Sequence, residues 1–70
     1  MINEVLFLEM RLLQLFCTKH NLSASAANRI FNENAIWNYL EQCYDTLHMN
    51  GDDYILNDVD QIVASKGVVL

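Results

Sequence analysis

The chain has 70 residues, 53% of them apolar, and a net charge of −5 at pH 7, which together indicate one acidic domain with a small core. No apolar stretch is long enough to span a bilayer and no basic segment with a cleavage site marks a signal peptide, so we expect neither a membrane partner nor secretion. Because two cysteines are too few for a disulfide framework, we expect a single cytoplasmic domain over residues 1–70 with both thiols reduced.

A first helix is predicted over residues 3–19, and its apolar residues form two stripes separated by Glu9. The first stripe consists of Val5, Leu8, Leu12, Leu15 and Phe16. The second stripe consists of Leu6, Met10, Leu13 and Cys17, and Phe7 lies beside the polar arc. Because a surface helix needs only one stripe about 100° wide, we expect the second stripe to contact a partner. The alternative is a central helix that the chain's own helices cover on both sides.

A second helix is predicted over residues 23–32 and a third over residues 35–48. Ser23 is a good N-cap for the second helix, and the asparagines that follow it tolerate the turn geometry that ends it. The apolar side of the third helix consists of Ile36, Leu40, Cys43 and Leu47. Tyr39 lies at the edge of that side, so among Trp37, Tyr39 and Tyr44 it is the one we expect to be exposed and to serve as an interface anchor.

An extended connection over residues 52–56 is predicted to follow, because Gly51 is free to end the third helix with a positive φ. Asn57 is the predicted N-cap of a fourth helix over residues 57–66, and Gly67 ends it. The expected fold is therefore all-α, a compact bundle of about four short helices.

The acidic residues are concentrated in residues 30–65, which contain no lysine or arginine. They are Glu33, Glu41, Asp45, Asp52, Asp53, Asp58 and Asp60. Such a charge distribution repels phosphate and attracts a basic surface, so we expect it to steer a basic partner. The alternative is a solvated face that only keeps the protein soluble.

Two cysteine–histidine pairs could in principle bind a metal or act in catalysis: Cys17 with His20, and Cys43 with His48. A five-residue spacing places Cys43 and His48 about 140° apart on a helix, and both cysteines are expected to be buried, where thiolate is disfavoured. Calcium-loop and phosphate-loop patterns are missing. We therefore expect no metal, no cofactor and no catalytic residue. His48 ends the third helix, where it either caps the helix or contacts a partner.

The second and third helices resemble a helix-turn-helix motif in outline. The exposed face of the third helix would present Asn38, Glu41, Gln42 and Asp45. Two carboxylates on this face oppose binding to phosphates, so no direct contact with nucleic acid is expected. A DNA-binding regulator remains the least favoured alternative.

Tyr44, Leu47, His48, Gly51, Tyr54 and Asp58 form the pattern Y-x-x-L-H-x-x-G-x-x-Y-x-x-x-D. In this segment, and in its helix layout over about residues 3–63, the chain resembles a small bacterial domain family of uncharacterised function. The resemblance implies an accessory protein encoded beside other small proteins, in some cases a toxin-like ADP-ribosyltransferase, and hence an antitoxin or immunity partner. Members often have threonine where this chain has Met49, and the resemblance supplies no catalytic residues.

The sequence thus predicts a non-enzymatic module that binds another protein with a basic surface, as an antitoxin-like or regulatory partner. The residues expected to bind it are Leu6, Phe7, Met10, Leu13, Tyr39, His48, Asp52 and Asp53. A homodimer formed through the same helix is the alternative.

Overall fold

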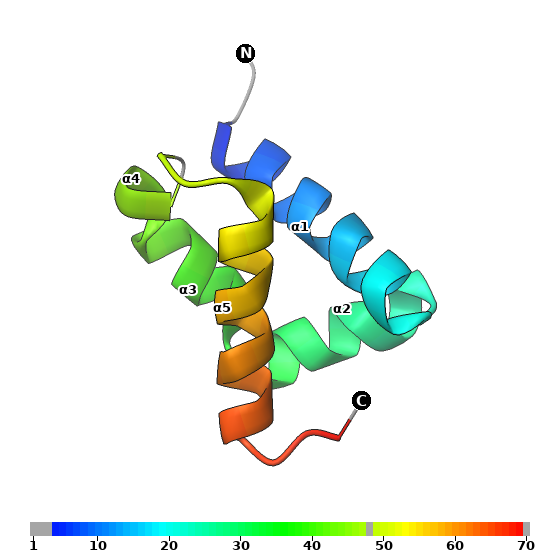
Figure 1. Ribbon diagram of the computed structural model, residues 1–70. Helices are drawn as coiled ribbons and strands as arrows, with labels where there is room; N and C mark the ends of the chain where they lie inside the picture. Colours follow the sequence, from blue (N-terminus) through cyan, green and yellow to red (C-terminus); the bar gives the residue numbers. More distant parts are fainter. Residues whose placement is uncertain (1–3, 48, 70) are drawn as a thin grey trace.

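Residues 4–47 and 49–69 are described by a computed structural model, and within them the chain forms helices and no strand (Figure 1). The helices are α1 (Glu4–His20), α2 (Ala24–Glu33), α3 (Ile36–Gln42), α4 (Tyr44–Leu47) and α5 (Asp52–Ser65). The first helix contacts α2, α3 and α5, so it is the element around which the others assemble. The predicted all-α class is confirmed, and the bounds of α1 and α2 lie within one residue of the prediction.

The core is built on the first stripe of α1, where Leu8, Leu12 and Phe16 recur every four residues and are almost fully buried. Its other members are Ala27, Phe31, Ile36, Leu40, Leu47, Ile55, Leu56, Val59 and Val63. The ring of Phe31 links α1 to α3, since its centroid lies 5.1 Å from that of Phe16 and 4.9 Å from that of Trp37. Every described helix therefore contributes to one core.

The turn between α2 and α3 is held by side-chain and backbone caps. Ser23 is the N-cap of α2 as predicted, because its hydroxyl accepts a 3.1 Å hydrogen bond from the amide of Ala26. At the other end, the buried Asn34 donates its side-chain amide to the carbonyl of Ile30 at 2.8 Å. The left-handed conformation predicted for an asparagine is instead taken by Ala35, at φ 56°.

The predicted continuous helix over residues 35–48 is wrong, because α3 ends at Gln42 and α4 begins at Tyr44. Cys43 separates them with φ −100° and ψ 8°. Its amide still donates to Tyr39, and its carbonyl accepts from Thr46 and Leu47. No glycine or proline marks the break, so the local sequence contains no signal for it.

The predicted extended connection over residues 52–56 is also wrong, because α5 already begins at Asp52. Gly51 is its N-cap with φ −72° rather than a positive φ, and its carbonyl accepts from Tyr54 and Ile55. At the other end the prediction is confirmed: Gly67 has φ 84° and ends the helix. The amides of Gly67 and Val68 return to Ala64 and Val63, which is a Schellman motif that brings Val68 onto the core.

Candidate protein-binding surface

The second stripe of α1 lies on the outside of the fold. Leu6 is 51% exposed and Met10 is 62% exposed, and the adjacent Phe7 is 63% exposed. Leu13 and Cys17 are partly buried because their inner atoms pack against the core. The alternative of an α1 covered on both sides therefore fails at Leu6 and Met10, whereas Leu13 and Cys17 are partly covered.

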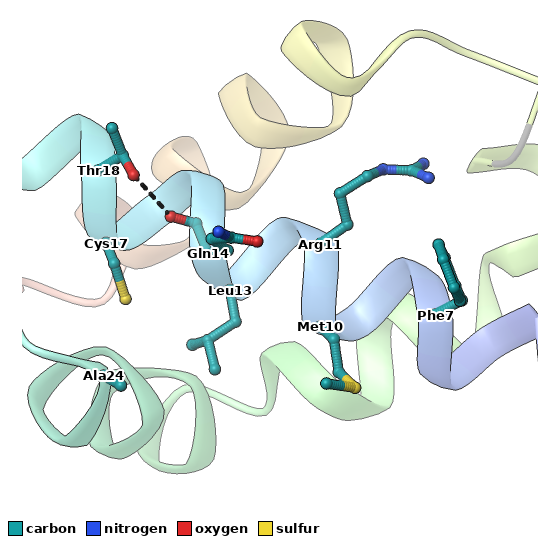
Figure 2. Close-up of a pocket in the computed structure, with 8 residues that line it drawn as sticks. All are labelled: Phe7, Met10, Arg11, Leu13, Gln14, Cys17, Thr18 and Ala24. Atoms are coloured by element: carbon teal, nitrogen blue, oxygen red, sulfur yellow. Dashed lines mark hydrogen bonds between the residues drawn. The ribbon is translucent and has the colours of Figure 1, made fainter.

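An open groove of about 670 Å³ runs along this stripe (Figure 2). It is lined by Phe7, Met10, Arg11, Leu13, Gln14, Cys17, Thr18 and Ala24. Figure 2 shows Leu13 and Cys17 pointing toward the start of α2, where the small side chain of Ala24 leaves room between the two helices. The groove therefore combines a mainly apolar wall on α1 with an edge on α2.

The side chains of two polar residues at the groove, Thr18 and Arg11, are bound within the chain itself. The hydroxyl of Thr18 donates to the carbonyl of Gln14 at 3.1 Å. The guanidinium of Arg11 reaches Oδ1 of Asp52 with Nε at 3.0 Å and Nη2 at 2.9 Å. Asp52, predicted to contact a partner, is thus half-buried and neutralised by Arg11, whereas Asp53 is exposed. Of this predicted pair, the structure leaves only Asp53 as an open charge.

Acidic side chains collect beside the N-terminal half of the stripe. Partial burial raises the pKa of Glu9, and the nearby charge of Glu41 on α3 raises it further. Glu41 and Asp45 are both exposed. At the same end of the fold, the hydroxyl of Tyr44 donates to Oε2 of Glu4 at 3.2 Å. One edge of the apolar stripe therefore lies in a negative environment.

A comparison with protein families finds a match over residues 8–66, which includes nearly all of the core and the groove. The chain belongs to the DUF3791 family, a protein family of unknown function. No curated protein and no solved structure matches it. This match agrees with the resemblance to a small domain family of uncharacterised function that the sequence indicated.

Within this DUF3791 domain, the segment that carried the resemblance lies at the junction of α4 and α5. Leu47 is buried in the core, and Gly51 caps α5. Tyr54 is 57% exposed, and Asp58 accepts a hydrogen bond from Tyr39. His48 lies outside the described residues, so its predicted partner contact stays a prediction. The segment thus combines residues that hold the fold with one large exposed aromatic side chain.

Tyr39 was expected to be exposed, but the structure leaves it only partly exposed, as it does Trp37 and Tyr44. Its ring packs against the core of the domain, and its hydroxyl donates to Oδ2 of Asp58 at 3.1 Å. Burial, together with this hydrogen bond and the charge of Asp58, raises the pKa of Tyr39 to about 12. Phe7 and Tyr54 are the exposed aromatic residues instead. Tyr39 therefore joins α3 to α5, and its predicted contact with a partner stays a prediction.

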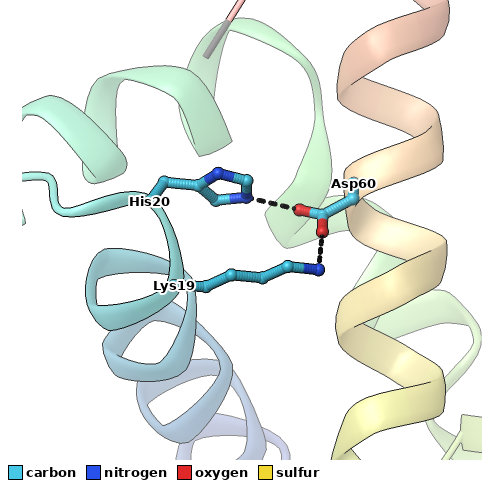
Figure 3. Close-up of polar contacts among 3 residues, drawn as sticks. All are labelled: Lys19, His20 and Asp60. Carbon is cyan, nitrogen blue, oxygen red and sulfur yellow. Dashed lines mark hydrogen bonds and ion pairs between the residues drawn. The ribbon is translucent and has the colours of Figure 1, made fainter.

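One polar cluster of the DUF3791 domain escaped prediction: Lys19 and His20, at the end of α1, both reach Asp60 on α5 (Figure 3). The distance from His20 Nε2 to Asp60 Oδ1 is 2.8 Å, and the His20 ring also lies against Phe16 at 4.6 Å. Partial burial raises the pKa of Asp60, but the hydrogen bonds from Lys19 and His20 outweigh it and lower the pKa. The cluster ties α1 to α5.

The two cysteines were considered above for metal binding and catalysis, and the structure shows how far each is buried. Cys17 and Cys43 are half-buried free thiols, not fully buried as expected. Among the residues that the structure describes, no three histidine, cysteine or acidic side chains are grouped so that they could hold a metal ion.

The described helices are also too short or too polar for any of them to cross a membrane.

Proposed function

We propose that this DUF3791 domain is a non-enzymatic module that binds another protein through the second stripe of α1. The observation that carries the proposal is that Leu6, Phe7 and Met10 each expose more than half of their surface on one helix. Covering large apolar side chains contributes about 1.5–3 kcal/mol for each that is fully buried, so this face offers a few kcal/mol to a partner. Contiguous exposed apolar surface of this kind marks interaction sites in soluble proteins.

Acidic residues beside this face favour a partner with a basic surface. Asp52 and Asp60 are already paired with basic side chains of the same chain, and Asp58 accepts from Tyr39, so the exposed acidic residues left to steer a partner are Glu33, Glu41, Asp45 and Asp53. Exposed charges of this kind accelerate association more than they strengthen the final complex. We therefore expect the association rate to fall as the salt concentration rises.

The finer proposal draws on the resemblance described above. We infer that the protein works in a bacterial cytoplasm as an antitoxin-like or regulatory partner of the product of a neighbouring gene, in some relatives a toxin-like ADP-ribosyltransferase. Its action would consist of occupying a surface of that product and would need no chemistry of its own.

Co-expression with the product of the adjacent gene tests the proposal. Met10→Glu places a carboxylate in the centre of the stripe, where docking would bury it at a cost of several kcal/mol, so the complex should no longer co-purify. Met49→Glu makes the same chemical change at a residue that is 78% exposed and outside the groove, and it should leave the complex intact. Retention of the complex by both variants would contradict the proposal.

Sedimentation distinguishes a partner protein from a second copy of this chain. We expect the pure protein to sediment as a monomer at about 100 μM, a concentration well above the dissociation constants of specific interfaces. A dimer that Met10→Glu dissociates would instead establish the homodimer.

A further inference from the structure

We propose that the occupant of the second stripe is an amphipathic α-helix of the partner, with lysine or arginine residues along one flank. This inference rests on the protein-binding function proposed above and adds the conformation and charge of the bound segment. Three features of α1 carry it: the spacing of its exposed apolar residues, their extent along the helix, and the charge at one edge.

The spacing of the stripe fits a second helix. Leu6, Met10, Leu13 and Cys17 follow one another at intervals of four, three and four residues. This alternation is the seam that two helices use when they pack side by side at about 20°. An extended segment places same-face side chains about 6.6 Å apart and gains affinity by pairing with a sheet edge, and the described residues contain no strand.

The extent of the stripe sets the length of the docked helix. From Leu6 to Cys17 the helix rises about 16 Å, so an occupant of about 12 residues would cover it. The groove beside Leu13 is bounded by Ala24, whose small side chain leaves space for one large apolar residue of the partner. A helix laid in this groove would thus be held by α1 along its length and by α2 at one end.

The charge at the edge decides between a partner and a second copy. Glu9 borders the stripe on the side of α3, and its pKa is raised by partial burial and by the charge of Glu41. Basic residues opposite these two carboxylates would relieve their repulsion. A second copy docked through the same face would bring its own Glu9 and Glu41 to the interface, since a two-fold interface uses the same patch of both copies. Each copy also carries a net charge of −5.

Three synthetic peptides of about 14 residues test the inference on the intact chain. The first is helical, with leucines at four–three spacing and lysines on one flank. The second replaces these lysines with glutamates. The third has the composition of the first, but its leucines alternate with polar residues as in a strand. Binding is measured by fluorescence anisotropy at low salt, with far-UV circular dichroism of each protein variant to confirm that it is folded.

We expect the lysine peptide to bind at least about fivefold more tightly than the glutamate peptide, since two surface charge pairs change sign. It should also bind more tightly than the alternating peptide and lose at least about tenfold in affinity with Met10→Glu. The double variant Glu9→Gln, Glu41→Gln should weaken the lysine peptide, whereas Glu33→Gln, which removes an exposed carboxylate outside the groove, should not.

Failure of this inference differs from failure of the proposed function. Equal binding of the lysine and glutamate peptides overturns the basic flank, and equal binding of the alternating peptide overturns the helix. No binding of any peptide, with a co-purified partner still lost in Met10→Glu, overturns the inference and leaves the binding surface in place. A partner that Met10→Glu does not release overturns both.

Discussion

The two apolar stripes of α1 have similar composition and opposite surroundings. Leu8, Leu12 and Phe16 of the first stripe are at most 3% exposed, whereas Leu6 and Met10 of the second are 51% and 62% exposed. Hydrophobicity alone therefore does not decide which face of a helix is buried. The positions of the other helices decide it.

The largest expected effect on the free energy of unfolding comes from shortening a side chain of the first, buried stripe. Phe16→Ala should cost about 3–5 kcal/mol, because it leaves a cavity next to Phe31. This is comparable to the whole stability expected of a domain this small, so the variant should be largely unfolded at 25 °C by circular dichroism. Phe7→Ala, on the exposed side, should change the free energy of unfolding by less than about 0.5 kcal/mol. Equal losses for the two variants would contradict the division between the stripes.

A smaller effect is expected from the cluster that ties α1 to α5. Asp60→Asn removes the negative charge and one of the two acceptor oxygens that Lys19 and His20 share, and it should lower the free energy of unfolding by about 1–2 kcal/mol at pH 7 in urea titrations. Asp53→Asn, at an exposed carboxylate, should change it by less than about 0.5 kcal/mol.

The acid dependence of stability sharpens this prediction. The pKa of Asp60 is lowered in the folded state, so its contribution is present above its ordinary value of 3.8 and is lost as the pH falls through the folded value. The difference between wild type and Asp60→Asn should therefore shrink below about pH 4. A difference that persists unchanged at pH 2 would contradict an ionic origin.

Tyr39 and Tyr54 extend the comparison to aromatic residues. Tyr39→Phe removes the hydrogen bond to Asp58 and should lower the free energy of unfolding by about 1 kcal/mol, whereas Tyr54→Phe should leave it nearly unchanged. The pKa of Tyr39 is about 12 in the folded state and about 10 in an unfolded chain, so the folded state is stabilised as long as the hydroxyl keeps its proton. This contribution is complete below pH 10 and is lost as the pH rises toward 12. An absorbance titration should lose its component near pH 12 in Tyr39→Phe.

The smallest expected effect is a gain at a strained residue in the turn between α2 and α3. Ala35 has φ 56°, a conformation that glycine adopts without a steric cost. Ala35→Gly should therefore raise the free energy of unfolding by about 0.5 kcal/mol, seen as a higher melting temperature. Ala64→Gly, on the exposed side of α5, should lower it by about 1 kcal/mol, because glycine disfavours a helix interior. A loss in both variants would show that Ala35 is not strained.

The sequence was sufficient where a signal is local. The two stripes of α1, the Ser23 cap and the end of α5 at Gly67 depend on residues within a turn or two of one another, and each was predicted. The class of the fold followed from these local signals. The role of the second stripe in binding a partner stays a prediction.

The predictions of burial and pairing failed where the partners of a side chain lie far away in the sequence. Tyr39 is partly buried because Asp58, 19 positions away, accepts its hydroxyl, and Asp60 is paired with residues about 40 positions earlier. No periodicity in the chain encodes such pairs. The early start of α5 was missed because Gly51 was assigned to the end of the preceding helix, although Asp52 and Asp53 suit the first turn of a new one.

Sharing α1 between the core and the outer groove has a consequence for the lifetime of the protein in the cell. A ligand that binds the outer face of this helix also stabilises the folded state. The free energy of unfolding then rises as the concentration of free ligand increases above its dissociation constant. Proteases act on opened chains, so an unaccompanied copy is degraded sooner than one in a complex. The abundance of this domain should therefore track the supply of whatever binds it.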